Sequence, residues 1–409
     1  MKVLKIIAGT LFLLAFTTYA QAQKFIAYQG KISIDSLKIL NADFDVKYFA
    51  DTSEIRFYIN KNATINSLTI NGKNTLYQTE IPENFLPDLE SIVIRTAPSQ
   101  QTSDLKIQYS YDLTKIENPT FIYNPHWIEL SFYTGWFPVN LSSKNYAYTL
   151  DFEIPENYKI ISSGKITRDG NHIHIVNNNN EFDIPVVLSD EFQIFGTKNR
   201  KVQFYGTQLQ PNTIADIQSV SENIYTFYEK RFGDCNSSSL IVAVNPFNHS
   251  MSYSRKGFIS LSFNHKFSDA SKRILAHEIG HLWWKNAPFG TWEEWLGESF
   301  AEYSSLIWAE QNMHEKDFKV LIAKYKNKYE TMPKISEVKS LDDPNWNDVI
   351  YLKGAYMLYQ LNKNIGDKKM NLFLRKTNQM KISNTKDLLN LLKTVTDEKT
   401  EEKFAKDIE

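Results

Sequence analysis

The chain has 409 residues, of which 42% are hydrophobic and 14% aromatic, so it can bury large cores and form two or more domains. Its net charge of -1 and isoelectric point near 6.7 exclude a bulk attraction to nucleic acid or to an anionic membrane. The single cysteine, Cys235, excludes an internal disulfide and a zinc site built from several thiolates. We therefore expect a multidomain protein that has no nucleic-acid partner.

The chain begins with a segment typical of a signal peptide. Lys2 and Lys5 precede an apolar run, Ile6–Phe16, that is too short to cross a bilayer. The small-x-small pattern Ala20-Gln21-Ala22 follows and favours cleavage after Ala22. An uncleaved membrane anchor is the alternative. The sequence predicts a signal peptide at residues 1–22 and a secreted or periplasmic mature protein with no integral membrane segment.

Residues 23–207 show the alternation of apolar and polar side chains that is typical of half-buried strands. The runs Leu105–Tyr111 and Tyr148–Ile154 alternate with period two, and Asn71-Gly72 is a turn signal between such runs. The asparagine run Asn177–Asn180 is interpreted as a loop. We expect an N-terminal antiparallel β domain with one solvated face.

Residues 208–409 change to a mainly helical pattern. Two strands interrupt it, one at Leu240–Val244 and one at Gly257–Phe263. A helix follows, which Ser268 or Asp269 can cap and which we expect to run to about Lys285. The expected fold class is therefore multidomain, β followed by α+β.

The predicted helix contains the sequence AHEIGHLWWKN, in which two histidines lie four residues apart. His277 and His281 share one helix face, so both imidazoles can bind one Zn²⁺ at about 2.0–2.1 Å. Glu278 is offset around the helix and can take a proton from a metal-bound water without binding the metal itself. Two surface histidines on an amphipathic helix are the alternative.

A third ligand is expected from the helix that follows. Glu298 and Glu302 lie one turn apart in the run Thr291–Gln311, which is helix-forming past Gly297, and a hairpin through Asn286–Gly290 can bring this helix back against the first. Glu298 would then complete a His₂Glu site, a ligand set typical of catalytic zinc. Glu302 would accept the outer N–H of a ligand histidine, or it is a solvated helix carboxylate.

The sequences HEIGH and WLGESFAEY together resemble the zinc signature of the M1 aminopeptidase family, which belongs to the gluzincins. The resemblance implies a thermolysin-like, mainly helical zinc catalytic domain after the β domain. It makes His277, His281 and Glu298 the ligands of one zinc ion per chain, and Glu278 the general base. The 16 residues between His281 and Glu298 are two fewer than is usual in the family, which indicates a shorter connection.

A second segment, VIYLKGAYMLYQL, resembles the family's Y-x-K-G-A sequence. The resemblance makes Tyr351 the donor to the oxyanion of the tetrahedral intermediate. A core tyrosine is the alternative. The resemblance ends near Leu392, so the large C-terminal helical domain of many members is not expected here.

The family's G-x-M-E-N motif, whose glutamate binds the free α-amine of the substrate, is not intact. Met251 matches its methionine, and Ser252 stands where the glutamate is expected. A second amine-binding acid in the family aligns with Glu129, for which a surface strand residue is the alternative. The strand at Gly257–Phe263 is expected to pair with an extended peptide through its main chain.

These observations predict an exported zinc metallopeptidase that acts on peptides or proteins. Whether it removes amino-terminal residues or cuts internally is left open, as is its oligomeric state. Two other functions are compatible with the sequence. One is a peptide-binding protein of weak or no activity that keeps the zinc for structure, although no fourth ligand is evident nearby. The other is hydrolysis of a non-peptide bond on the same zinc centre.

Overall fold

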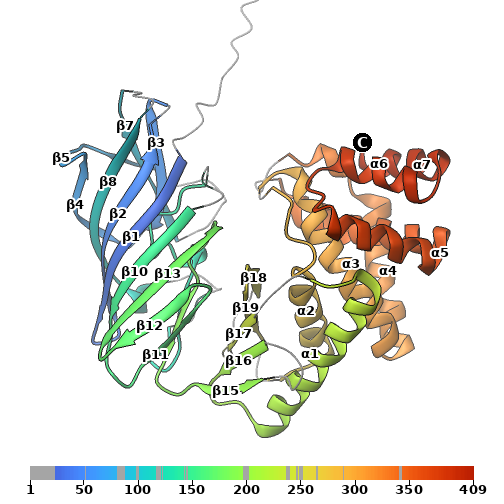
Figure 1. Ribbon diagram of the computed structural model, residues 1–409, viewed down its shortest axis with the longest axis horizontal. Coiled ribbons are helices and arrows are strands. Elements are labelled where there is room, and N and C mark those ends of the chain that lie inside the picture. Colours follow the sequence, from blue (N-terminus) through green and yellow to red (C-terminus); the bar gives the residue numbers. More distant parts are fainter. Residues whose placement is uncertain are drawn as a thin grey trace, which may run out of the picture.

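The computed structural model of the protein describes residues 24–409 except 51, 81–87, 98–100, 117–120, 122, 142, 144–145, 197–201, 236–239, 246, 248–251, 264–265, 289 and 340–342 (Figure 1). The predicted signal peptide, with its cleavage site after Ala22, lies outside the described residues, and so does Met251. No helix in these described ranges is long and apolar enough to cross a membrane.

The N-terminal part is built around an eight-stranded sheet. In spatial order its strands are β12 (Lys165–Asp169), β13 (His172–Glu181), β10 (Tyr146–Glu153), β1 (Lys24–Asp35), β2 (Ile39–Phe49), β8 (Thr102–Asp112), β4 (Thr64–Ile70) and β5 (Lys73–Asn74). The pairing is antiparallel except between β1 and β10, which run parallel with Ala27 opposite Ala147. Alternate side chains such as Tyr28, Phe44 and Leu150 are buried on one face, as the period-two pattern predicts.

Two three-stranded sheets complete this part. One contains β3 (Glu54–Asn60), β7 (Leu89–Arg95) and β6 (Gln78–Glu80), and the other β11 (Lys159–Ser162), β14 (Val186–Ser189) and β9 (Ile128–Leu130). The short 3₁₀ helices η1 (Leu113–Lys115) and η2 (Phe132–Thr134) lie in the connections.

The asparagine run is a strand and not the predicted loop. Residues 177–180 continue β13, and Asn177 pairs with Tyr148 of β10. The side chain of Asn177 is buried and donates to the Tyr148 hydroxyl at 3.2 Å. The prediction was wrong because β10 supplies partners that the sequence alone does not reveal. Its backbone pairs with this run, and its Tyr148 hydroxyl accepts from the side chain of Asn177.

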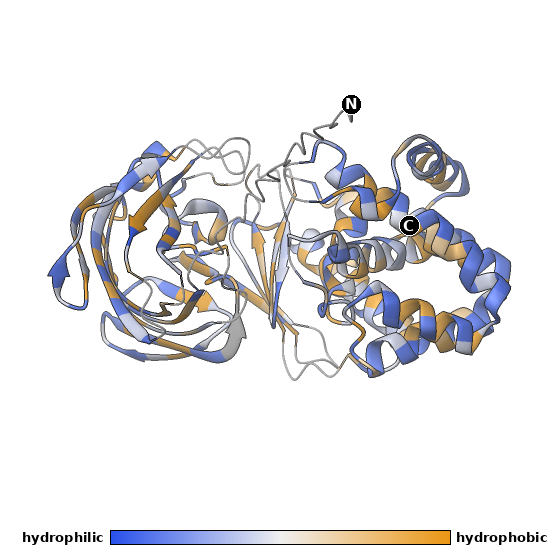
Figure 2. Ribbon diagram, turned by 90° about the horizontal axis from the view of Figure 1, so that it is seen from above, coloured by the Kyte–Doolittle hydropathy of each residue, from blue (hydrophilic) through white to orange (hydrophobic). Residues whose placement is uncertain are grey.

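A five-stranded sheet lies between this β part and the helices (Figures 1 and 2). Its spatial order is β15 (Gln193–Gly196), β16 (Val202–Gly206), β17 (Leu240–Asn245), β19 (Phe258–Ser262) and β18 (Tyr253–Arg255). β16 pairs parallel with β17, so the sheet joins strands from both sides of residue 208. The predicted boundary between the β pattern and the mainly helical pattern, at residues 207/208, therefore falls within one sheet.

The edge strand of this sheet differs from the predicted one. β19 is paired on both sides, with β17 and with β18, so it cannot accept a peptide. The chain reverses at Lys256-Gly257, where Gly257 has a φ of 75°, and places β18 outside β19. The edge that could pair with a peptide is therefore β18, at Tyr253–Arg255.

The rest of the chain is helical. The main helices are α1 (Pro211–Phe232), α2 (Asp269–Gly280), α3 (Trp295–Asn312), α4 (Glu315–Thr331), α5 (Gly354–Gln379), α6 (Thr385–Val395) and α7 (Glu398–Ile408). The 3₁₀ helices η3 (Trp292–Glu294) and η4 (Ile335–Glu337) and the π-helix η5 (Asp348–Lys353) lie between them. This order confirms the predicted fold class, a β domain followed by a mainly helical α+β domain.

Apolar side chains join the β part to the five-stranded sheet. Trp127, Ile161 and Val187 form one buried cluster with side chains of β17, β18 and β19, namely Ala243, Tyr253 and Phe258. This contact lies on the face of the small sheet that is turned away from the helices. The helices therefore pack on one face of the sheet and the β part on the other (Figure 2).

Candidate metal centre

Helix α2 carries the two histidines. It begins as predicted, with Ser268 as the N-cap residue whose side chain accepts from the N–H of Ser271. The helix ends at Gly280, earlier than the predicted Lys285. His281 nevertheless keeps helical backbone angles, φ -62° and ψ -13°, and therefore stays one turn from His277. The ring centres of the two histidines are 4.8 Å apart.

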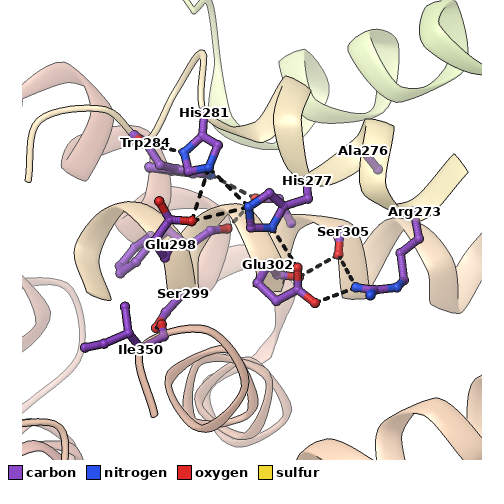
Figure 3. Close-up of polar contacts among 12 residues, drawn as sticks. Arg273, Ala276, His277, His281, Trp284, Glu298, Ser299, Glu302, Ser305 and Ile350 are labelled. Atoms are coloured by element: carbon purple, nitrogen blue, oxygen red, sulfur yellow. Dashed lines mark hydrogen bonds and ion pairs between the residues drawn. The ribbon is translucent and has the colours of Figure 1, made fainter. Parts of the chain in front are cut away.

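The predicted hairpin brings α3 back against α2. The two helices pack so closely that a Cβ atom on Gly280 would lie 3.2 Å from the Cα of Ala301. Trp284, just past α2, packs on Phe300 with 5.2 Å between ring centres. This packing turns the first turn of α3, and with it Glu298, toward the histidines (Figure 3).

His277, His281 and Glu298 converge on one point. The Nε2 atoms of the two histidines are 3.1 Å apart. Oε2 of Glu298 lies 3.4 Å from Nε2 of His277 and 3.3 Å from Nε2 of His281 (Figure 3). A tetrahedral zinc ion with bonds of about 2.0–2.1 Å needs ligand atoms about 3.3–3.4 Å apart. The three atoms therefore fit a zinc ion, and the predicted ligands are together.

Glu302 holds the outer nitrogen of one ligand. Nδ1 of His277 donates to Oε2 of Glu302 at 2.6 Å, and Arg273 and the Tyr325 hydroxyl donate to Oε1. Burial raises the pKa of Glu302, but Arg273 and His277 outweigh burial and hold that pKa well below its usual range. Glu302 is buried and charged, so the solvated-carboxylate alternative does not fit.

The two carboxylates also change the pKa of His277. Burial lowers the pKa of His277, but hydrogen bonds to Glu298 and Glu302 outweigh it and raise that pKa to about 10. Nδ1 of His281 donates to the carbonyl oxygen of Trp284 at 3.2 Å, which fixes its ring. Both Nε2 atoms thus face Glu298. A bound cation would displace the protons that these nitrogens otherwise direct toward the carboxylate.

Glu278 is buried beside this cluster on α2. Among the described residues, no hydrogen-bond donor reaches its Oε2 atom. Burial raises the pKa of Glu278, and the charges of the two histidines oppose that rise. A buried carboxylate with a free acceptor atom suits a group that takes up a proton.

Tyr351 lies on the π-helix η5 with its ring stacked against His277. The ring centres are 5.9 Å apart and the planes differ by 15°. Burial raises the pKa of Tyr351 well above its usual value, and the negative charges of Glu298 and Glu294 add to this rise. The phenol therefore stays protonated and can donate a hydrogen bond next to the ligand cluster.

The two candidate amine acceptors are both engaged elsewhere. Glu129 on β9 is buried, so it is not the surface residue that was one alternative. It accepts hydrogen bonds from Trp127, from Asn245 and from Ser260, at 3.2, 3.0 and 2.5 Å. The Ser252 hydroxyl accepts from the N–H of Ser262 at 2.9 Å.

Sequence reasoning missed Arg273 and Tyr325. Arg273 lies four residues before His277, so the helical spacing that paired the histidines also places Arg273 on their face. Tyr325 belongs to α4 and carries no local signal, because only the packing of α4 brings it to Glu302.

Residues 254–407 match the model of the peptidase family M1 domain, a range that holds all three ligands, Glu278 and Tyr351. No curated protein matches the sequence.

Several solved structures share the fold. The M1 zinc metallopeptidase from Deinococcus radiodurans is 15% identical with a TM-score of 0.65, and the match covers 95% of this chain and 94% of that one. Native yeast LTA4 hydrolase is 17% identical with a TM-score of 0.66, over 95% of this chain and 68% of that one. Legionella pneumophila aminopeptidase A is 14% identical with a TM-score of 0.71, over 94% of this chain and 49% of that one.

Proposed function

We propose that the protein is a zinc-dependent peptidase that hydrolyses peptide bonds in peptides or proteins. One observation carries the proposal. Three ligand atoms lie 3.1–3.4 Å apart beside a buried carboxylate that has a free acceptor atom. His277, His281 and Glu298 would hold one zinc ion, which when bound lowers the pKa of a water and polarises the scissile carbonyl.

The side chains of this chain supply the remaining parts of the reaction. Glu278 takes the proton of the attacking water on its free Oε2 and passes it to the departing amine. The Tyr351 hydroxyl donates to the oxygen on which negative charge develops. Glu302 keeps the ring of His277 in place by accepting its Nδ1–H.

We further propose that the peptidase does not depend on a free amino terminus. A substrate ammonium needs a carboxylate beside it, since burying an unpaired charge is costly. The hydroxyl of Ser252 binds a backbone N–H, and the carboxylate of Glu129 already accepts three hydrogen bonds. The edge strand β18 can hold an extended peptide through its main chain instead.

Metal analysis and a peptide panel test this function. We expect about one zinc per chain and turnover of both free and N-acetylated peptides. A preference above roughly a hundredfold in kcat/KM for the free amine, about 2.7 kcal/mol, would contradict the independence from the amino terminus. One zinc per chain with no turnover of any peptide would instead favour a binding protein or hydrolysis of another bond.

We also propose that the protein is exported to a secreted or periplasmic location after removal of residues 1–22. The charged start, the short apolar run and the small residues before Gln23 support this proposal. Mass spectrometry of the protein from its native cells is expected to give an amino terminus at Gln23. A chain that retains Met1 and stays with the membrane would favour an uncleaved anchor.

A further inference from the structure

Ser299 follows the ligand Glu298 on α3, and the proposed reaction does not use it. The residue is fully buried, so its hydroxyl needs a hydrogen-bond partner within the protein. That hydroxyl donates to the carbonyl oxygen of Ile350 on η5 at 2.5 Å (Figure 3). A side-chain hydrogen bond thus joins a ligand helix to the π-helix that carries Tyr351.

The accepting carbonyl belongs to the peptide bond that leads into Tyr351. A peptide bond is planar, so the Ile350 oxygen forms one rigid unit with the backbone nitrogen and the Cα atom of Tyr351. A bond that holds the oxygen therefore fixes the plane from which the side chain of Tyr351 starts. The link from Glu298 to Tyr351 runs through their neighbours, Ser299 and Ile350, and the hydrogen bond between these two.

Close packing of η5 on α3 makes this hydrogen bond possible. Gly354 directly follows η5, and a Cβ atom there would lie 2.8 Å from Cβ of Ser299 and closer still to its Oγ. A larger residue at position 354 would push the serine away. The missing side chain of Gly354 therefore lets η5 come near enough to α3 for Ser299 to reach the carbonyl of Ile350.

Other contacts tether η5 to α4, a helix that carries none of the three ligands. Nζ of Lys353 donates to the carbonyl oxygen of Met332, just past α4, at 2.9 Å. Lys328 on α4 pairs with Asp348 at 2.6 Å. These contacts hold the two ends of η5, but they do not connect it to the ligands. The bond from Ser299 does, because Ser299 is the neighbour of a ligand in the chain.

We propose that Ser299 is a positioning residue, whose hydroxyl holds the π-helical turn so that the Tyr351 hydroxyl is aimed at the metal centre. This inference rests on the proposed peptidase function and on the role of Tyr351 in it. Ser299 contacts no reacting atom and acts through Tyr351. An oxyanion donor is effective only when it is held within about 0.5 Å of its working position.

The π-helix explains why a tether is needed. The N–H of Gly354 bonds to the carbonyl oxygen of Val349, five residues earlier. Such turns are rare and often lie at functional sites. Without the Ser299 hydroxyl, the buried carbonyl of Ile350 loses a donor and η5 relaxes toward the four-residue bonds of an α-helix. That change rotates the residues of η5 about the helix axis and moves the Tyr351 hydroxyl.

A double-mutant cycle on the full-length, zinc-loaded enzyme tests the proposal. Ser299→Ala removes the hydroxyl and adds no bulk. It should lower kcat about ten- to fiftyfold, with a smaller change in KM and about one zinc per chain retained. In the Tyr351→Phe background the same substitution should lower kcat less than about twofold, because the hydroxyl that Ser299 positions is already gone. Equal factors in both backgrounds would overturn the proposal, since they are the result expected of a serine that only packs.

Ser221→Ala is the matched control. Ser221 is also fully buried, and its hydroxyl donates to the carbonyl oxygen of Ile217 on its own helix, α1, at 2.7 Å. This variant should lower the melting temperature about as much as Ser299→Ala does and leave kcat unchanged. A fall in kcat as large as that of Ser299→Ala would show that the loss of any buried hydroxyl has this effect, and would overturn the proposal.

Crystal structures of the wild type and of Ser299→Ala give a readout that does not depend on turnover. We expect the Tyr351 hydroxyl to move by more than about 0.5 Å in the variant while the three ligands stay in place. An unmoved hydroxyl would overturn the positioning role even if peptides are cleaved. A wild-type enzyme that cleaves no peptide would contradict the peptidase function, while the two crystal structures would still decide on Ser299. Should Ser299→Ala fold poorly, Gly354→Ala displaces the same hydroxyl from the side of η5, and its effect on kcat should likewise vanish in the Tyr351→Phe background.

Discussion

Glu298 contributes the third ligand atom, and the two histidines alone leave a metal ion under-coordinated. Glu298→Ala should therefore lose zinc on dialysis, which atomic absorption measures as metal per chain. Glu278→Gln is the matched control, because it removes a proton acceptor and no ligand. It should retain about one zinc and lose most hydrolysis, with kcat falling roughly 10²- to 10⁴-fold. Full zinc occupancy in Glu298→Ala would remove that residue from the ligand set.

Tyr351→Phe removes one hydroxyl next to His277 and almost no volume. A donor to the oxyanion predicts a fall in kcat of about 10²- to 10³-fold with a smaller change in KM, whereas a packing residue predicts little change. Tyr359→Phe is the control, since its hydroxyl donates to Glu310 at 2.7 Å on the same run of helix. Steady-state kinetics on one peptide compares the two variants. Equal kcat values would show that Tyr351 is a packing residue of the core.

The ligand cluster could be predicted from the sequence because helical spacing fixes it locally. His277 and His281 lie one turn apart, and Glu298 follows after a short connection that allows the next helix to fold back. The environment of Glu129 could not be predicted, because two of its donors, Asn245 and Ser260, come from strands more than a hundred residues away. The partner of Ser299 could not be predicted either, because Ile350 is supplied by another element, η5.

The close packing of α2 on α3 depends on a residue without a side chain. Gly280→Val would add a Cβ at 3.2 Å from the Cα of Ala301, with two further methyl groups in the same space. We expect α3 to shift, zinc affinity to fall about tenfold or more and the melting temperature to fall. Zinc titration and thermal unfolding measure both effects.

Gly297→Ala provides the control for this prediction. A Cβ there meets its nearest atom, the carbonyl oxygen of Trp284, at 3.6 Å, which is an ordinary contact. This variant should bind zinc as the wild type does. Loss of zinc in Gly297→Ala, or wild-type affinity in Gly280→Val, would show that the helix spacing does not set the ligand geometry.

At the level of elements, periodicity predicted which segments are strands and which are helices, but not how they end or pair. The capping residue Ser268 fixed the start of α2, whereas its end at Gly280 depends on the turn into α3. The order of β18 and β19 depends on the reversal at Gly257, which a run of apolar residues does not reveal. The π-helix that carries Tyr351 likewise has no signal in the periodicity.

At the level of the whole molecule, Glu129 joins the β part to the five-stranded sheet. Glu129→Gln replaces an acceptor by an amide N–H₂ that faces donors. The free energy of unfolding should therefore fall by about 1–3 kcal/mol, and the melting temperature should fall with it. If the role is structural, KM should change in parallel for free and N-acetylated peptides. A rise in KM confined to free amines would make Glu129 the amine acceptor.

The three ligand residues occupy a short stretch of the chain, since all of them lie between the start of α2 and the first turns of α3. The large sheet is different, because β1 must find β10 more than a hundred residues away. Loop-closure entropy favours the nearer contacts, and contacts between distant strands form slowly. The hairpin can therefore gather its three ligands while the N-terminal sheet is still open. Metal capture would then precede the closure of the molecule and give the growing helical core a fixed point on which to pack.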